Sequence, residues 1–167
     1  EHKILSAQYW ESLNSPSTGS VCSVAGSPDE FYLRATGMVL KLFNNYFLGE
    51  KRIKAQAVNI PKNDDYDDIT FLTAKDSNGA VYVLLINKSE ANDYPVKLDI
   101  KDLSKTVKLN SWCLIGSSLS SMNHTSYGLK DTNVIDIEKD TIEEVDSQNI
   151  SYLIPAHSVN VLRVSEN

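Results

Sequence analysis

A histidine next to a serine, His157 and Ser158, is the pair in this sequence that most resembles part of a hydrolytic site, because a serine nucleophile needs an imidazole base. The pair lies in residues 154–164, where polar and apolar side chains alternate. Adjacent residues of a strand point to opposite faces of a sheet, so these two side chains cannot hydrogen-bond to each other. The chain also lacks a Gly-x-Ser-x-Gly nucleophile turn. The segment is therefore predicted to be a structural strand.

Two acidic segments carry oxygen ligands of the kind that Ca²⁺ prefers. Residues 63–68 read Asn-Asp-Asp-Tyr-Asp-Asp, and Asp76 and Asn78 flank Ser77 in a second segment. The first segment lacks the glycine and the distal glutamate of an EF-hand loop, and the second matches only the start of a calcium loop. We interpret the first as a solvated loop between strands and the second as turn chemistry. With 3 His, none in HxxxH spacing, and no cysteine cluster, we predict no metal site and no cofactor.

Glu11 is the carboxylate whose position is most suggestive of a binding site. It follows Tyr9 and Trp10 at the end of an apolar run, and catalytic groups of α/β barrels collect at the carboxyl ends of the strands. Asp29 and Glu30, by contrast, are explained by the electrostatics of a helix start. No spacing in the sequence identifies a pair of carboxylates for glycoside cleavage, so no catalytic residue is assigned.

The composition is that of a folded protein that does not bind polyanions. The 167 residues are 41% hydrophobic and 23% charged, with a net charge of −6. Nucleic-acid binders need clustered Lys and Arg, and a membrane span needs about 20 apolar residues, so we predict neither a nucleic-acid nor a membrane partner. Cys22 and Cys113 are far apart and either pair in an oxidising compartment or remain free thiols.

The first 50 residues have a different pattern from the rest. Residues 3–10 read as a buried strand, and a Ser/Gly/Pro-rich loop follows at residues 12–26. A helix is predicted from Asp29 to Leu48, with Ser27 as its N-cap and Gly49 as its stop. Its apolar residues cover more than one face, and a lone βα unit cannot bury its own strand and helix. We therefore expect this unit to pack against a partner, either an upstream barrel chain or a second copy.

From Lys51 onward the chain is rich in short strand patterns. Eight are rich in β-branched or aromatic residues: 52–60, 69–76, 80–88, 94–102, 106–116, 133–139, 149–155 and 157–165. The Asn78–Gly79 pair predicts a tight hairpin with positive φ angles. The fold class is therefore mainly β: an antiparallel β-sandwich of about eight strands, preceded by one βα unit. The predicted domains are residues 1–50 and residues 51–167, the second folding without the first.

This arrangement resembles the C-terminal part of retaining glycoside hydrolases, and most closely the α-L-arabinofuranosidases of glycoside hydrolase family 51. The resemblance lies in ILSAQYW as the last barrel strand, in FYLRATGMVLKLFNNYFLGE as the last barrel helix, in VYVLLINKSEANDYPVKLDI, and in LSSMNHTSYGLKDTNVIDIE followed by IPAHSVNVLRV. It implies a (β/α)8 barrel that ends near residue 50 and runs into a sandwich.

The resemblance also implies roles for three residues. The family's acid/base and nucleophile glutamates lie on barrel strands four and seven, which would precede residue 1, so the chain alone is expected to be inactive. The Ala7–Gln8 step matches one whose amide hydrogen-bonds the sugar, and Trp10 would line the sugar subsite. Glu11 stands where the family more often has an amide. Gln8, Trp10 and Glu11 are thus the predicted substrate-binding residues.

Two other functions fit the same residues. The chain can be read as a free-standing carbohydrate-binding module, which would present a row of exposed aromatic side chains, or as a protein-interaction domain with an acidic surface. If the chain is part of an arabinofuranosidase-like enzyme, the expected carbohydrate partner is an arabinose- or xylose-containing glycan, which is bound through the full enzyme. A secreted or extracellular location is expected.

Overall fold

The computed structural model describes residues 35–48, 68–101, 103–116 and 136–166, together with the backbone of four short strands at 13–14, 25–26, 32–33 and 52–55. One helical segment consists of the α-helix α1 (Ala35–Leu42) and the π-helix η2 (Phe43–Leu48). The strands are β1 (Leu13–Asn14), β2 (Ala25–Gly26), β3 (Tyr32–Leu33), β4 (Arg52–Ala55), β5 (Ile69–Asp76), β6 (Val81–Asn87), β7 (Tyr94–Leu98), β8 (Thr106–Ile115), β9 (Asp136–Asp146), β10 (Ile150–Ile154) and β11 (Ser158–Ser165).

The strands of the C-terminal part form two antiparallel sheets. The larger sheet has the order β4-β5-β6-β11-β8-β9, and β10 pairs with β7 in a second sheet. β11 lies between β6 and β8, with Val161 opposite both Leu84 and Trp112. This central position agrees with the burial of the strand on both faces, because the successive residues Asn160, Val161 and Leu162 are each 0% exposed. Six of the eight residues of β11 are buried.

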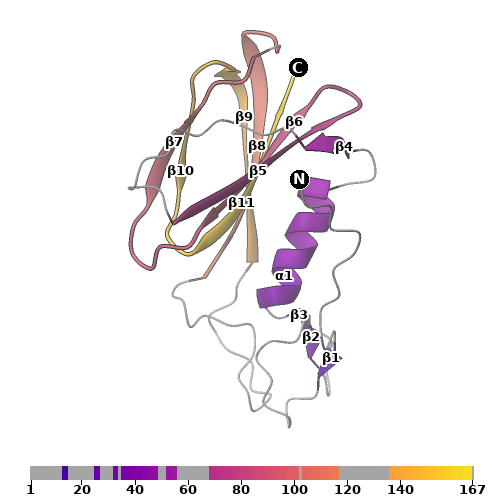
Figure 1. Ribbon diagram of the computed structural model, residues 1–167, viewed down its shortest axis with the longest axis vertical. Coiled ribbons are helices and arrows are strands. Elements are labelled where there is room, and N and C mark those ends of the chain that lie inside the picture. Colours follow the sequence, from indigo (N-terminus) through magenta and orange to yellow (C-terminus); the bar gives the residue numbers. More distant parts are fainter. Residues whose placement is uncertain are drawn as a thin grey trace.

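Each face of the larger sheet has its own cover, as Figure 1 shows. On one face the helical segment packs against a cluster that includes Ala74, Tyr82, Leu84, Leu114 and Val161. On the other face β7 and β10 enclose a second cluster, made by Val83, Leu85, Val107, Leu109, Ile150, Ile154, Leu162 and Val164. The two clusters are separated by the sheet because successive side chains of each strand point to opposite faces.

The helical segment is an integral part of the first cluster. Met38, Leu42 and Phe47 are buried against the sheet, and Leu42 is 0% exposed. Phe47 follows Leu42 by five residues, which is the spacing of the wider π turn. The π-helix η2 therefore places Phe47 on the side of the helical segment that faces the sheet, where Leu42 also lies. The apolar face of the helix is thus covered by the chain's own sheet, which differs from the expectation that it needs a partner. The domain boundary at residue 50 stays a prediction, but the core on this face is shared across it.

The start of the helix was predicted wrongly. A helix from Asp29 is interrupted by β3, whose Tyr32 and Leu33 pair with Gly26 and Ala25 of β2, and the helix begins at Ala35. Aromatic and large apolar residues suit a strand as well as a helix, and pairing with β2 decides between them. The predicted strand at residues 3–10 and the N-cap at Ser27 lie outside the described residues.

The β5–β6 hairpin closes through a three-residue loop rather than a two-residue turn. Gly79 N–H donates to Asp76 O at 3.1 Å, and Asp76 N–H donates to Ala80 O at 3.0 Å. Gly79 has φ of 87°, whereas Asn78 keeps a negative φ. The Asp76 carboxylate accepts from Asn78 N–H and Ala80 N–H, so this carboxylate stabilises the turn.

Substitution of Gly79 by Ala is expected to lower the stability of the protein. A Cβ at this position meets no atom within 4 Å, so the cost is that of the positive φ alone, about 1 kcal/mol. For a chain of this size that corresponds to a fall of about 3 °C in the midpoint of thermal unfolding, measured by circular dichroism. Ser77→Ala in the same loop is the control and should leave the midpoint unchanged. An unchanged midpoint for Gly79→Ala would contradict the loop geometry.

Candidate functional site

Gln8, Trp10 and Glu11, the substrate-binding residues predicted from the sequence, lie outside the described residues, so their role stays a prediction. Of the acidic segment 63–68 only Asp68 is described, and its carboxylate accepts a hydrogen bond from Tyr94 Oη at 3.3 Å. In the part of the chain that is described, no cluster of His, Cys, Asp and Glu is suited to hold a metal ion.

His157 and Ser158 have separate structural roles. His157 adopts φ of 43° in the turn before β11, and its Nε2–H donates to Gly116 O at 3.0 Å. Ser158 is buried, its hydroxyl donates to Pro155 O at 2.6 Å, and it accepts from Asn160 Nδ2 at 2.7 Å. The two side chains do not bond to each other. The predicted strand is confirmed for Ser158 onward, whereas His157 belongs to the turn before it.

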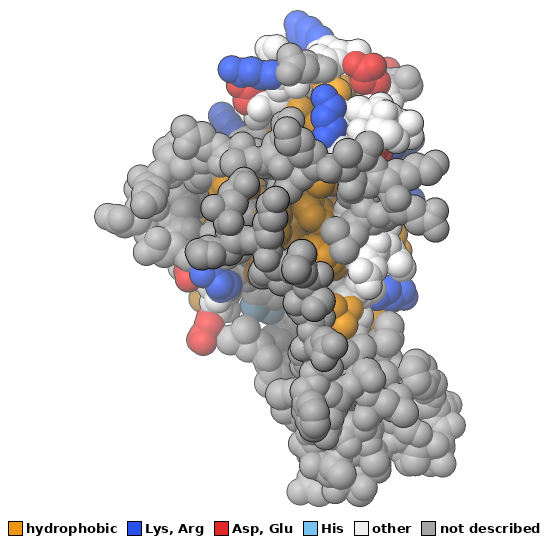
Figure 2. Space-filling view, turned by 45° about the vertical axis from the view of Figure 1, so that its right-hand side comes forward, with side chains coloured by type: hydrophobic (Ala, Val, Ile, Leu, Met, Phe, Trp, Pro, Cys, Tyr) orange, Lys and Arg blue, Asp and Glu red, His pale blue; other side chains and the backbone are white. Residues whose placement is uncertain are grey.

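A charged groove of about 540 Å³ lies on the helix-bearing face of the large sheet. The residues that line it are Lys108, Glu143, Glu144, Arg163, Ser165 and Glu166. They come from β8, β9 and the end of β11, beyond the part of the sheet that the helix covers. On this side Figure 2 shows hydrophobic side chains over the middle of the molecule and side chains of both charges toward its upper end.

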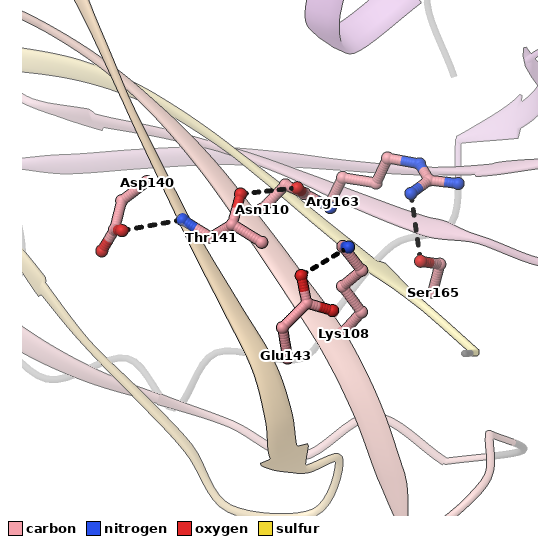
Figure 3. Close-up of polar contacts among 7 residues, drawn as sticks. All are labelled: Lys108, Asn110, Asp140, Thr141, Glu143, Arg163 and Ser165. Atoms are coloured by element: carbon pink, nitrogen blue, oxygen red, sulfur yellow. Dashed lines mark hydrogen bonds and ion pairs between the residues drawn. The ribbon is translucent and has the colours of Figure 1, made fainter.

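The two cationic side chains of the groove each have a partner among the residues that line it. Lys108 Nζ lies 2.7 Å from Glu143 Oε1, and Arg163 Nη1–H donates to Ser165 Oγ at 3.0 Å (Figure 3). Arg163 Nε–H also donates to Tyr82 Oη, which in turn donates to Asp76 Oδ2. The guanidinium is thus held by Ser165 of β11 and Tyr82 of β6, and Asp76 of β5 in turn holds the Tyr82 hydroxyl.

The groove lacks the features of a hydrolytic centre. A general acid needs a carboxyl group whose pKa is raised. In Glu166 the side-chain hydrogen bond from Ser104 Oγ, together with the backbone hydrogen bond from Ser104 N–H, lowers the pKa of the carboxyl. Glu143 is tied to Lys108. The Glu166 carboxyl is therefore not suited to act as a general acid, and the groove suits a polar contact surface.

A second polar region lies on the opposite face of the sheet, between β8, β9 and β10. Tyr152 of β10 donates from its Oη to Asn160 Oδ1 at 2.9 Å. Burial raises the pKa of Tyr152 to about 12; the charges of Cys113, Asp140 and Glu138 add to this rise, and a side-chain hydrogen bond with Ser111 opposes it. Sequence reasoning missed this cluster, because the residues come from different strands and no single segment shows them together.

Cys113 is a free thiol, and its environment suppresses ionisation. Burial, and then the negative charge of Glu138, raise the pKa of the thiol to about 11 from 9.0. Since the thiolate is the reactive form, the thiolate fraction near neutral pH is about 100-fold smaller than for an ordinary cysteine. Cys22 lies outside the described residues.

Alkylation of Cys113 by iodoacetamide is therefore expected to be slow in the folded protein. In a Cys22→Ser background, mass spectrometry near neutral pH should show a rate about 100-fold below that of the urea-unfolded chain. The rate should rise with pH up to about 11 and level off above it. Equal rates in the folded and unfolded protein would contradict the environment described for Cys113.

Known structures share this arrangement of a helical segment and two sheets. The chain superimposes on the GH51 α-L-arabinofuranosidase of Thermotoga petrophila RKU-1 with a TM-score of 0.64 and 17% identity, over 86% of this chain and 32% of that one. The fold is that found in GH51 arabinofuranosidases. The Thermotoga maritima α-L-arabinofuranosidase, solved as an arabinose complex, gives a TM-score of 0.65 and 18% identity over 85% of this chain and 31% of that chain.

A third GH51 arabinofuranosidase, from Xanthomonas axonopodis pv. citri, gives a TM-score of 0.56 with 15% identity, over 86% of this chain and 29% of its own. The chain therefore spans about a third of the length of these enzymes. The resemblance inferred from the sequence is confirmed as a likeness of fold. No protein-family model matches the sequence, and no similar sequence is found among curated proteins.

Proposed function

We propose that this chain is the non-catalytic C-terminal portion of an arabinofuranosidase-like glycoside hydrolase and that it supports the catalytic barrel. The observation that carries this proposal is the superposition on arabinofuranosidases over 86% of the chain at a TM-score of 0.64. The two core clusters support it, because they join two sheets and a helical segment into one packed body. Catalytic carboxylates, and contacts to an arabinose- or xylose-containing glycan, would come from the remainder of such an enzyme, with Gln8, Trp10 and Glu11 contributing to the sugar site.

A carbohydrate-binding module is the second function with the same fold class. Such a module binds glycans through aromatic side chains on an accessible face. Among the described residues, Tyr82 and Phe47 are buried, and Tyr46 stacks on Trp112 with ring centroids 4.7 Å apart. Within the described part of the chain, every phenylalanine, tyrosine and tryptophan side chain is at least partly buried. The supporting role is therefore favoured over glycan binding.

We propose further that the enzyme is secreted or extracellular, in keeping with a polymeric glycan substrate. In the described residues, no helix is long and apolar enough to cross a membrane.

The supporting role is tested on the product of the complete gene. Leu42→Ala should leave its rate of hydrolysis of 4-nitrophenyl α-L-arabinofuranoside unchanged at low temperature. Heat inactivation of this variant should occur at a temperature several degrees lower, because Leu42 joins the helix to the sandwich. Leu40→Ala, on the exposed side of the helix, is the matched control. Failure of the complete product to hydrolyse the substrate would overturn the enzyme class, and equal heat inactivation of both variants would overturn the supporting role.

A further inference from the structure

The small sheet of β7 and β10 covers only part of the large sheet. Tyr94 of β7 contacts Asp68 beside β5, whereas Tyr152 of β10 contacts Asn160 of β11. β10 therefore lies on the side of β7 that is nearer to β8 and β9, in keeping with Figure 1. Ile142 of β9 is 46% exposed, although it lies opposite Leu109 of the buried cluster in the strand register. The large sheet thus extends beyond β10 with an apolar residue uncovered.

The two edges of the small sheet differ in their ability to accept another strand. Pro95 of β7 lies opposite Leu153 of β10, and proline is tolerated in a sheet where its nitrogen faces away from the ladder. The pair is therefore a non-hydrogen-bonded one, and the outer edge of β7 lacks a donor at Pro95. By the alternation of an antiparallel ladder, the N–H and C=O groups of Ser151 and Leu153 then point to the outer edge of β10. Among the described strands, β10 pairs with β7 alone.

The surroundings of this outer edge are acidic. Glu138 and Asp140 are exposed on β9, and both lie close enough to Tyr152 to influence its ionisation. They point to the same face of the sheet as Cys113 and Ser111, which they oppose in the β8–β9 register. The side chain of Leu153 is 55% exposed on the outer face of the small sheet.

We propose that the outer edge of β10 is a docking site for an extended strand of a partner polypeptide in which Lys or Arg alternates with β-branched apolar residues. The strand's backbone bonds to Ser151 and Leu153, as in other cases of strand addition to a sheet edge. Its inward basic side chains reach Glu138 and Asp140, and their methylene stems cover Ile142. Its outward apolar side chains lie beside Leu153. A second copy of this chain fits less well, because it would bring acidic residues to an acidic surface.

The test uses a blocked peptide of alternating Lys and Val, and one of alternating Glu and Val as the counterpart. Amide exchange of Ser151 and Leu153 is followed by NMR on the 167-residue chain. The Lys–Val peptide should slow exchange at these two amides by about tenfold or more, and the Glu–Val peptide should not. The double variant Glu138→Lys, Asp140→Lys should reverse this preference. Glu144→Lys, on the groove side of the same strand, should leave it unchanged.

Three outcomes overturn the proposal. The first is equal exchange with and without the Lys–Val peptide. The second is slow exchange that depends on the concentration of the chain alone, which would identify a second copy as the occupant. The third is protection by both peptides alike, which would remove the role of Glu138 and Asp140. None of these readouts depends on glycosidase activity, so the result stands apart from the proposed function.

Discussion

Replacement of Leu42 by Ala is expected to lower the free energy of unfolding by about 3 kcal/mol. Leu42 is 0% exposed and lies in the cluster that joins the helical segment to Leu84, Leu114 and Val161 of the large sheet. Removal of its side chain leaves a cavity between two rigid surfaces that cannot close around it. Urea unfolding of the chain followed by circular dichroism measures the change, read as a fall in midpoint with an unchanged slope.

Leu40→Ala is the matched control for this experiment, because it makes the same chemical change on the exposed side of the same helix, two residues before Leu42. Leu40 is 39% exposed, and its loss is expected to cost less than about 1 kcal/mol. If the two substitutions have equal effects, the helix does not contribute to the core in the way described.

The contribution of the helix to the core also predicts that a chain beginning at Lys51 loses one of its two core clusters. This outcome contrasts with the independent folding expected from the strand pattern alone.

Replacement of Asn87 by Ala is expected to destabilise the protein by a similar amount, about 3 kcal/mol, by a different mechanism. The side chain is 2% exposed and stands at the end of β6. Its Nδ2 donates to Asn92 O at 2.8 Å and to Pro155 O at 2.9 Å, and its Oδ1 accepts from Ser89 N–H at 2.9 Å. These bonds tie the large sheet to the loops that begin β7 and follow β10. Without them, buried carbonyl groups lose their donor.

Asn87→Asp separates the donor role from the acceptor role. The aspartate retains an oxygen for Ser89 N–H but places a second oxygen against the carbonyl groups of Asn92 and Pro155, so it should be at least as destabilising as Ala at neutral pH. Glu90→Ala, at an exposed neighbouring position, should have little effect. Urea unfolding of the three variants measures these differences. Wild-type stability in Asn87→Asp would show that the donated bonds are unimportant.

Most strands could be predicted from the sequence because their local pattern and their place in the sheet agree. β5 occupies residues 69–76 as predicted, and β6, β8 and β11 lie within one or two residues of their predicted bounds. β9 was predicted to end at Lys139 but continues to Asp146 through a segment rich in acidic residues. A charged segment is compatible with a strand at the edge of a sheet, and only pairing with β8 shows that it is one.

The polar clusters could not be predicted, because each depends on register between strands distant in sequence. Arg163 meets Tyr82 across β11 and β6, and Tyr152 meets Asn160 across the two sheets. Neither partner is marked by any local motif. The π-helical end of the helix is a similar case, since burial of Phe47 in place of Tyr46 depends on packing against the sheet.

The most direct test of the proposed function is a comparison of turnover by the chain and by the product of the complete gene. Hydrolysis of 4-nitrophenyl α-L-arabinofuranoside is measured for both at equal molar concentration. We expect rapid turnover by the complete product and none above background by residues 1–167, because no pair of carboxylates for glycoside cleavage can be identified in this chain. Turnover by the isolated chain that is abolished by Glu11→Gln would contradict the proposal that this portion is non-catalytic.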